Sequence, residues 1–130
     1  MRVIFDTNIF VSAFVIPGSL AEKAILKIIE GDDTLLLSKE ILDELLSTLS
    51  TKFSRDRGEI SRVAVILSER VEWVRPTQRI RVLKDEPDNR ILERAISGKA
   101  DIVVTGDKEM LRLGEYGKTK IISLRAYLES

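Results

Sequence analysis

The chain has 130 residues, with 21 lysines and arginines, 21 aspartates and glutamates, no histidine and no cysteine. The last two absences exclude a thiolate nucleophile, a disulfide framework, a Cys/His zinc site and any catalysis that relies on imidazole. The length is typical of one domain, so we expect residues 1–130 to form a single domain.

The first half of the chain alternates short apolar runs with segments of helical period. Apolar runs at residues 1–5 and 34–37 predict buried strands. Residues 8–14 predict a short helix, and residues 20–30 a longer one capped by Ser19. Ser38 is the expected N-cap of a third helix, whose apolar positions are Ile41, Leu42, Leu45, Leu46 and Leu49.

The second half continues this alternation. Helical spacing predicts helices over residues 58–70, 88–97, 108–113 and 124–129, and apolar runs predict strands over 71–74, 100–104 and 119–123. Residues 75–86 show no clear period and are expected to form a loop. Strands that alternate with helices predict βαβ units, and hence an α/β fold of three layers around a mostly parallel sheet.

Four acidic residues fall near one edge of this predicted sheet. They are Asp6 and Asp107, which follow strands, and Glu44 and Asp88, which lie early in helices. Ligands of open parallel sheets bind outside the carboxyl ends of the strands. Four carboxylates gathered there repel one another and lose hydration, and a divalent cation that prefers oxygen ligands relieves both costs. The pattern therefore predicts a Mg²⁺ or Mn²⁺ site.

Each acidic residue also has a purely structural explanation. Asp6, Asp88 and Asp107 are placed to cap the helices that follow them, and Glu44 suits a solvated helix surface. Four separate coincidences would be needed to bring all of them to one edge for structural reasons alone. Their common placement is what favours a functional site.

The balanced charge hides an uneven distribution. Residues 1–50 carry four basic and eight acidic side chains, whereas residues 51–80 carry seven basic, six of them arginines, and four acidic. Basic residues between 52 and 84 are candidates for gripping phosphates, with a solvated helix surface of mixed charge as the alternative. Trp73, the only tryptophan, lies in a strand pattern, so we expect it to pack in the core or an interface rather than stack on a base.

Four segments resemble the motifs of the PIN domain family, which are small metal-dependent ribonucleases. They are IFDTN at 4–8, SKEILDEL at 38–45, DEPDNRIL at 85–92 with Ala95 following, and ADIVVTGD at 100–107. Each alone is a weak signal, but four in order across nearly the whole chain are specific. The resemblance implies a five-stranded parallel sheet between helices, in one PIN-like nuclease domain.

The resemblance also implies a site and a reaction. The implied catalytic and metal-binding residues are Asp6, Glu44, Asp88 and Asp107. They would hydrolyse RNA phosphodiester bonds with one or two Mg²⁺ or Mn²⁺ ions, while Asn8 and Thr105 would orient the carboxylates or a water. Asp85 competes for the third acidic position. Asp88 is preferred because Asn89 follows it directly and because it is expected to begin the helix.

The biological role implied by the resemblance is the toxin of a bacterial or archaeal toxin–antitoxin pair. Its partners would be RNA, a small antitoxin protein and a second copy of the chain. No apolar run is long enough to cross a bilayer and no signal-peptide pattern is present, so we expect a soluble cytoplasmic protein. Two alternatives remain: a phosphatase or phosphotransferase with Asp6 as nucleophile, and a catalytically idle module that binds RNA or protein.

Overall fold

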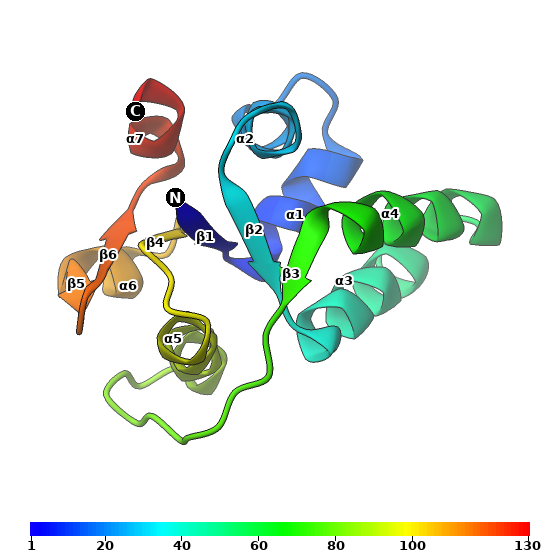
Figure 1. Cartoon of the computed structure of the whole chain (residues 1–130). Helices are drawn as coiled ribbons and strands as arrows, with labels where there is room; N and C mark the ends of the chain where they lie inside the picture. The colour runs from blue at the N-terminus through cyan, green and yellow to red at the C-terminus, as the bar shows by residue number, and fades with distance from the viewer.

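A computed structural model describes residues 1–130 and has six strands in one sheet (Figure 1). The strands are β1 (Arg2–Phe5), β2 (Thr34–Leu37), β3 (Val71–Trp73), β4 (Ile102–Val104), β5 (Glu115–Tyr116) and β6 (Thr119–Ile122). Their order in the sheet is β3-β2-β1-β4-β6-β5. All pairs are parallel except β5 with β6. The α/β fold class and the mostly parallel sheet are confirmed.

Seven helices flank this sheet. They are α1 (Thr7–Val15), α2 (Leu20–Glu30), α3 (Lys39–Thr51), α4 (Arg57–Arg70), α5 (Glu86–Ser97), α6 (Lys108–Leu113) and α7 (Leu124–Glu129). Ser19 and Ser38 cap α2 and α3 as predicted, because their hydroxyl oxygens accept from backbone amides three residues on, at 3.1 and 3.2 Å. Helix α5 begins two residues before Asp88, since Pro87 suits the first turn of a helix.

The sheet has one strand more than the five expected. Strand β5 has two residues, too few to show an alternation in the sequence, and it pairs antiparallel with β6. The chain reverses at Gly117, whose φ of +60° lies in the left-handed region that favours glycine. The extra strand adds to the sheet at one edge, next to β6, and leaves the order of the parallel strands unchanged.

Two apolar clusters, one on each face of the sheet, form the core. Helices α1, α2, α3, α4 and α7 contribute to the first cluster, where the ring of Phe5 packs edge-on against Phe10 and Tyr127 at centroid distances of 5.7 and 5.6 Å. Helices α5 and α6 contribute to the second, around Leu92 and Val103. Because both faces are covered, the central strands are continuous apolar runs rather than alternating ones.

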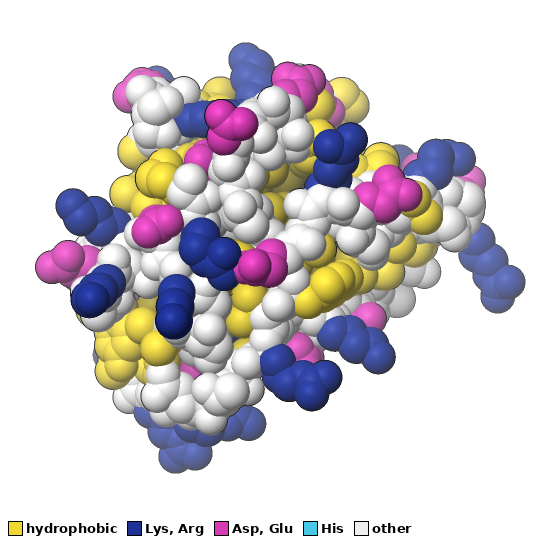
Figure 2. All heavy atoms as spheres, in the orientation of Figure 1, with side chains coloured by type: hydrophobic (Ala, Val, Ile, Leu, Met, Phe, Trp, Pro, Cys, Tyr) yellow, Lys and Arg dark blue, Asp and Glu magenta, His cyan; other side chains and the backbone are white.

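Trp73 does not pack in the core, which was one of the two placements, core or interface, expected from its strand pattern. Strand β3 lies at the edge of the sheet and pairs only with β2, so nothing covers its outer side. The Trp73 side chain is consequently 49% exposed. Beyond it, residues 74–85 run to α5 without helix or strand, one residue earlier than the loop predicted over 75–86, along the lower margin of Figure 1. Figure 2 shows Lys and Arg side chains along that margin.

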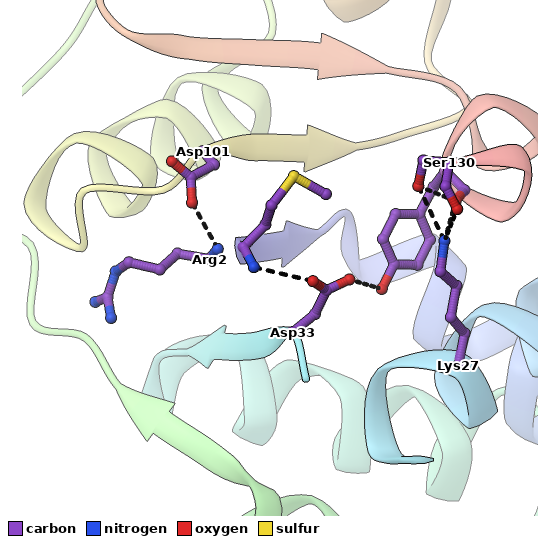
Figure 3. Close-up of polar contacts among 7 residues, drawn as sticks. Arg2, Lys27, Asp33, Asp101 and Ser130 are labelled. Carbon is purple, nitrogen blue, oxygen red and sulfur yellow. Dashed lines mark hydrogen bonds and ion pairs between the residues drawn. The ribbon is translucent and has the colours of Figure 1, made fainter. Parts of the chain in front are cut away.

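Polar contacts join distant segments at the amino ends of the strands (Figure 3). The N-terminal ammonium and the Tyr127 hydroxyl both donate to Asp33, each at 2.9 Å. Partial burial acts to raise the pKa of Asp33, but these two hydrogen bonds prevail and hold it below its usual range. Lys27 donates to Ser130 and lies 4.3 Å from the centre of the Tyr127 ring. These contacts stabilise the end of the sheet opposite the carboxyl ends of the strands.

No single helix is long and apolar enough to cross a membrane; α1 and α2 together pass on length and composition alone, with a bend of 103° between them.

Candidate active site

An acidic cavity of about 490 Å³ opens where β1 and β4 end. Its lining includes six carboxylates, which belong to Asp6, Glu44, Asp85, Glu86, Asp88 and Asp107. Thr7, Asn8 and two arginines of α5, Arg90 and Arg94, complete the polar lining. The structure therefore brings together all four acidic residues singled out in the sequence.

Asp6 is fixed at both carboxylate oxygens. It directly follows β1, and its backbone amide donates to the Val104 carbonyl at 3.0 Å, which extends the pairing with β4. Its Oδ1 accepts from the Asn8 amide at 3.1 Å and so caps α1, and its Oδ2 accepts from the Thr105 hydroxyl at 2.8 Å. The side chain is 8% exposed. Asp6 therefore caps α1 and lines the cavity at the same time.

Thr105 links Asp6 to Asp107. Its fully buried hydroxyl donates to Asp6 and accepts from the Asp107 amide at 3.0 Å. Asp107 in turn caps α6, with its Oδ1 accepting from the Met110 amide at 3.0 Å. One hydroxyl thus joins the Asp6 carboxylate to the Asp107 backbone. Asn8 differs, because only its backbone contacts Asp6 and its side chain is exposed.

Asp88 is the carboxylate whose environment is least favourable to charge. It lies on α5, is 5% exposed, and its Oδ2 is buried without a hydrogen-bond partner. Burial, followed by the negative charges of Asp107, Asp85 and Asp6, raises the pKa of Asp88 to about 6. Asp85 occupies the N-cap position of the same helix, is exposed, and makes no capping hydrogen bond. Both line the cavity, but only Asp88 is buried there.

Glu44 and the two arginines stand apart from this tightly held group. Glu44 lines the cavity from α3 and is exposed to solvent. Arg90 pairs with Glu86 at 3.1 Å and with Glu93 at 2.8 Å. The Nε atom of Arg94 is buried without a partner. Burial lowers the pKa of Arg94, against the opposing effect of Glu40 and Glu44.

Neither arginine was predicted as part of the site. Arg90 and Arg94 lie four residues apart, a spacing that places both on one side of a helix, and this was the available signal. The same spacing is common on solvated helix surfaces, so it did not distinguish arginines of a site from arginines that face solvent.

The donor set of the cavity fits a hard divalent cation. All candidate ligands are oxygens, which Mg²⁺ and Mn²⁺ prefer, and the orphaned Asp88 Oδ2 is an atom that a cation would satisfy. No three Asp or Glu side chains in the chain stand in an arrangement that would already hold a metal ion. Binding would therefore require side-chain rotations that draw the carboxylates closer together.

Fold and site together define an α/β domain with an acidic cavity at the carboxyl ends of its parallel strands. Residues 2–109 match the PIN domain family, and the chain belongs to that family. This confirms the resemblance found in the four sequence motifs. An uncharacterized protein of Methanocaldococcus jannaschii is 32% identical over 122 residues, which cover 91% of this chain and 78% of that protein.

Two solved structures share the fold. VapBC2 from Rickettsia felis, bound to a DNA fragment from the promoter, matches with a TM-score of 0.69 and 21% identity, over 95% of this chain and 98% of that one. VapBC-1 from nontypeable Haemophilus influenzae matches with a TM-score of 0.66 and 20% identity, over 96% and 99% of the two chains. At these identities the likeness concerns the fold.

Proposed function

We propose that this protein is a metal-dependent endoribonuclease that hydrolyses RNA phosphodiester bonds in the cytoplasm. The observation that carries the proposal is the acidic cavity, where Asp88 keeps a buried carboxylate oxygen without a partner beside Asp6 and Asp107. Such a cavity is costly for the protein alone and favourable around one or two Mg²⁺ or Mn²⁺ ions. Membership of the PIN domain family supports the same reaction.

Each residue would contribute in a definite way. Asp6, Asp88 and Asp107 would hold the ion, and Glu44 would ligate a second ion or hold the attacking water. When bound, a divalent cation lowers the pKa of a coordinated water and polarises the phosphoryl oxygen. Thr105 would position one ligand, because its hydroxyl holds the Asp6 carboxylate and also anchors the Asp107 backbone.

The proposal is tested by incubating labelled single-stranded RNA with the protein in Mg²⁺, in Mn²⁺ and in EDTA. We expect cleavage only with a divalent cation, and a loss of at least about 100-fold in Asp6→Asn, because the lost charge weakens the ligand set. Asp32→Asn is the matched control, since Asp32 is exposed and lies outside the cavity. Circular dichroism checks that both variants fold.

Four outcomes would count against the proposal. Undiminished cleavage by Asp6→Asn, or cleavage that persists in EDTA, excludes the assigned metal site. An aspartyl-phosphate trapped on Asp6 would favour the phosphotransferase alternative. RNA binding without cleavage in any of the metal ions would favour the idle module.

We further propose that the protein is the toxin of a toxin–antitoxin pair and forms a homodimer. The shared fold with the two VapBC structures supports the first point. For a partner surface, Val65 and Ile66 of α4 remain exposed, 54% and 43%, and neighbouring exposed apolar side chains favour protein contacts. The test is co-expression with the product of the adjacent reading frame, with growth rescue expected, and light scattering to measure the mass of the isolated protein. Growth arrest that the product of the adjacent reading frame does not relieve contradicts the toxin–antitoxin pairing. A monomeric mass contradicts the homodimer.

A further inference from the structure

Three adjoining hollows form a path along the surface between α3, α5 and the loop of residues 74–85. The acidic cavity shares Arg90 and Arg94 with a second hollow of about 510 Å³. That second hollow shares Glu40 and Arg75 with a third, of about 640 Å³, which Trp73 lines. Because neighbours in this series share lining residues, the three hollows lie side by side from the acidic cavity to Trp73.

The charge of the lining changes along the path. The acidic cavity holds six carboxylates against two arginines, and the second hollow holds four arginines against two glutamates. In the third hollow, beside Trp73, two cations balance two carboxylates. Backbone phosphates suit a hollow with excess arginine, whereas an uncharged flat base suits a neutral hollow with an aromatic ring. Phosphates and bases occur together in a nucleic-acid strand.

The cations of the loop beside the path make no ion pair within the chain. Residues 75–84 contain Arg75, Arg79, Arg81 and Lys84 and no carboxylate. All four are exposed, and none takes part in an ion pair. Arg94, which lines both the acidic cavity and the second hollow, keeps its buried Nε without an acceptor. Phosphate oxygens would pair with the four exposed cations of the loop.

Side chains of α5 hold the backbone of this loop. Asn89 Oδ1 accepts from the amides of Val82 and Leu83 at 3.2 and 2.9 Å, and its Nδ2 donates to the Leu83 carbonyl at 2.8 Å. Glu93, itself buried, accepts from the Ile80 amide at 2.8 Å. A loop fixed in this way presents its cations in defined positions, which lowers the entropic cost of binding a charged strand.

We propose that single-stranded RNA follows this path, with a base stacked on Trp73 and backbone phosphates on Arg75 and Arg79, while the bond to be cleaved lies in the acidic cavity. The inference rests on the proposed ribonuclease function and names substrate-binding residues of the same site. Glu40 and Glu44 lie one helical turn apart on α3, about 6 Å, and line the third hollow and the acidic cavity respectively. The stacked base is therefore within a few nucleotides of the cleaved bond.

Trp73 offers a direct test because it is the only tryptophan in the chain. Oligouridylate RNA is titrated into Asp6→Asn protein in Mg²⁺, and tryptophan fluorescence is recorded. We expect saturable quenching, since a stacked base contacts the indole. In anisotropy titrations with labelled RNA, Trp73→Ala should bind about tenfold more weakly and Trp73→Phe should recover most of the affinity. Phe53→Ala, at another exposed aromatic residue, is the control and should not change binding.

The phosphate contacts are tested through salt dependence. Arg75→Gln should weaken binding and lower the slope of log affinity against log salt by about 0.7, the value for one contact on a single strand. Arg125→Gln, at an exposed arginine of α7 outside all three hollows, should leave the slope unchanged. In wild-type background, Trp73→Ala should raise KM for a long RNA with little change in kcat, and should have no effect on a dinucleotide.

The outcomes separate this inference from the proposed hydrolysis. If wild-type protein cleaves RNA but RNA neither quenches Trp73 nor binds more weakly to Trp73→Ala, the path is wrong and the nuclease stands. Quenching that depends on Arg75, in a protein that cleaves no RNA, supports the path and overturns the nuclease. Self-association lost in Trp73→Ala, with RNA affinity unchanged, would make this surface an interface between copies and overturn the path.

Discussion

The substitution Asp88→Asn removes the cavity carboxylate that is both buried and without a partner at one oxygen. The pKa of Asp88 is about 6 against an ordinary value of 3.8, and each pKa unit corresponds to about 1.4 kcal/mol. Ionisation therefore costs the folded state at most about 3 kcal/mol, and roughly 2 kcal/mol after solvent screening at the cavity opening. We expect Asp88→Asn to raise the free energy of unfolding of the metal-free protein by that amount at neutral pH.

The effect has a definite pH dependence. Because the folded protein binds the Asp88 proton more tightly than the unfolded chain does, this group lowers the free energy of unfolding as pH rises from 3.8 to about 6. Above that range its cost is constant, and below it the cost disappears. The stabilisation by Asp88→Asn should therefore be present near pH 7.5 and nearly absent near pH 4.

Urea unfolding of both proteins in EDTA at these two pH values measures the difference. Asp85→Asn is the matched control, because Asp85 lines the same cavity but is exposed, and it should stabilise the protein much less. Added Mg²⁺ should stabilise the wild type more than Asp88→Asn, since a bound cation removes the cost of the buried charge. If Asp88→Asn stabilises the protein equally at both pH values, the gain does not come from removing the ionised Asp88 carboxylate, and this explanation is refuted.

Three further substitutions test the packing, the site and the opposite end of the sheet. Gly98→Ala places a Cβ 2.9 Å from Leu36 Cδ1 and should lower the free energy of unfolding by about 1–3 kcal/mol. Gly106→Ala is the control, because a Cβ at that position meets nothing within 4 Å. An equal loss of stability in both variants would disprove the steric explanation. Thr105→Val removes a hydroxyl that both donates and accepts, so we expect a loss of about 1–3 kcal/mol and weaker Mg²⁺ binding by calorimetry, and unchanged Mg²⁺ affinity would argue against a positioning role. Tyr127→Phe removes the donor to Asp33 and should cost about 1 kcal/mol at neutral pH by urea unfolding. The pKa of Asp33 is lowered, so the stabilisation by its carboxylate is present at pH values above the ordinary pKa of the group and is lost in acid. If the effect of Tyr127→Phe on stability does not shrink in acid, this explanation is contradicted.

Much of the fold could be predicted because each local signal has one dominant cause. The period of 3.6 residues in α2 and the capping serines defined the helices, and apolar runs defined β1, β2 and β4 because those strands are buried on both faces. The clustering of carboxylates followed from the geometry of parallel strands, whose carboxyl ends meet at one edge.

The parts of the fold and the site that were not predicted depend on tertiary contacts that the sequence pattern does not encode. A strand pattern does not reveal whether the strand is central or at an edge, so the exposure of Trp73 was missed. Asp85 and Asp88 differ in burial because of how α5 packs at the cavity, which their spacing alone leaves open. Arg94 enters the site for a similar reason, since charged residues on a helix usually face solvent.

The loop of residues 74–85 separates what keeps the protein folded from what would determine its substrate. Its backbone is held by Asn89 and Glu93 and by the buried Ile80, whereas its exposed cations take part in no ion pair. Surface substitutions of that kind typically change stability by less than about 0.5 kcal/mol. The exposed positions of this loop can therefore diverge during evolution without a compensating change elsewhere in the domain, and on the proposed path such changes would alter which RNA is held and how tightly.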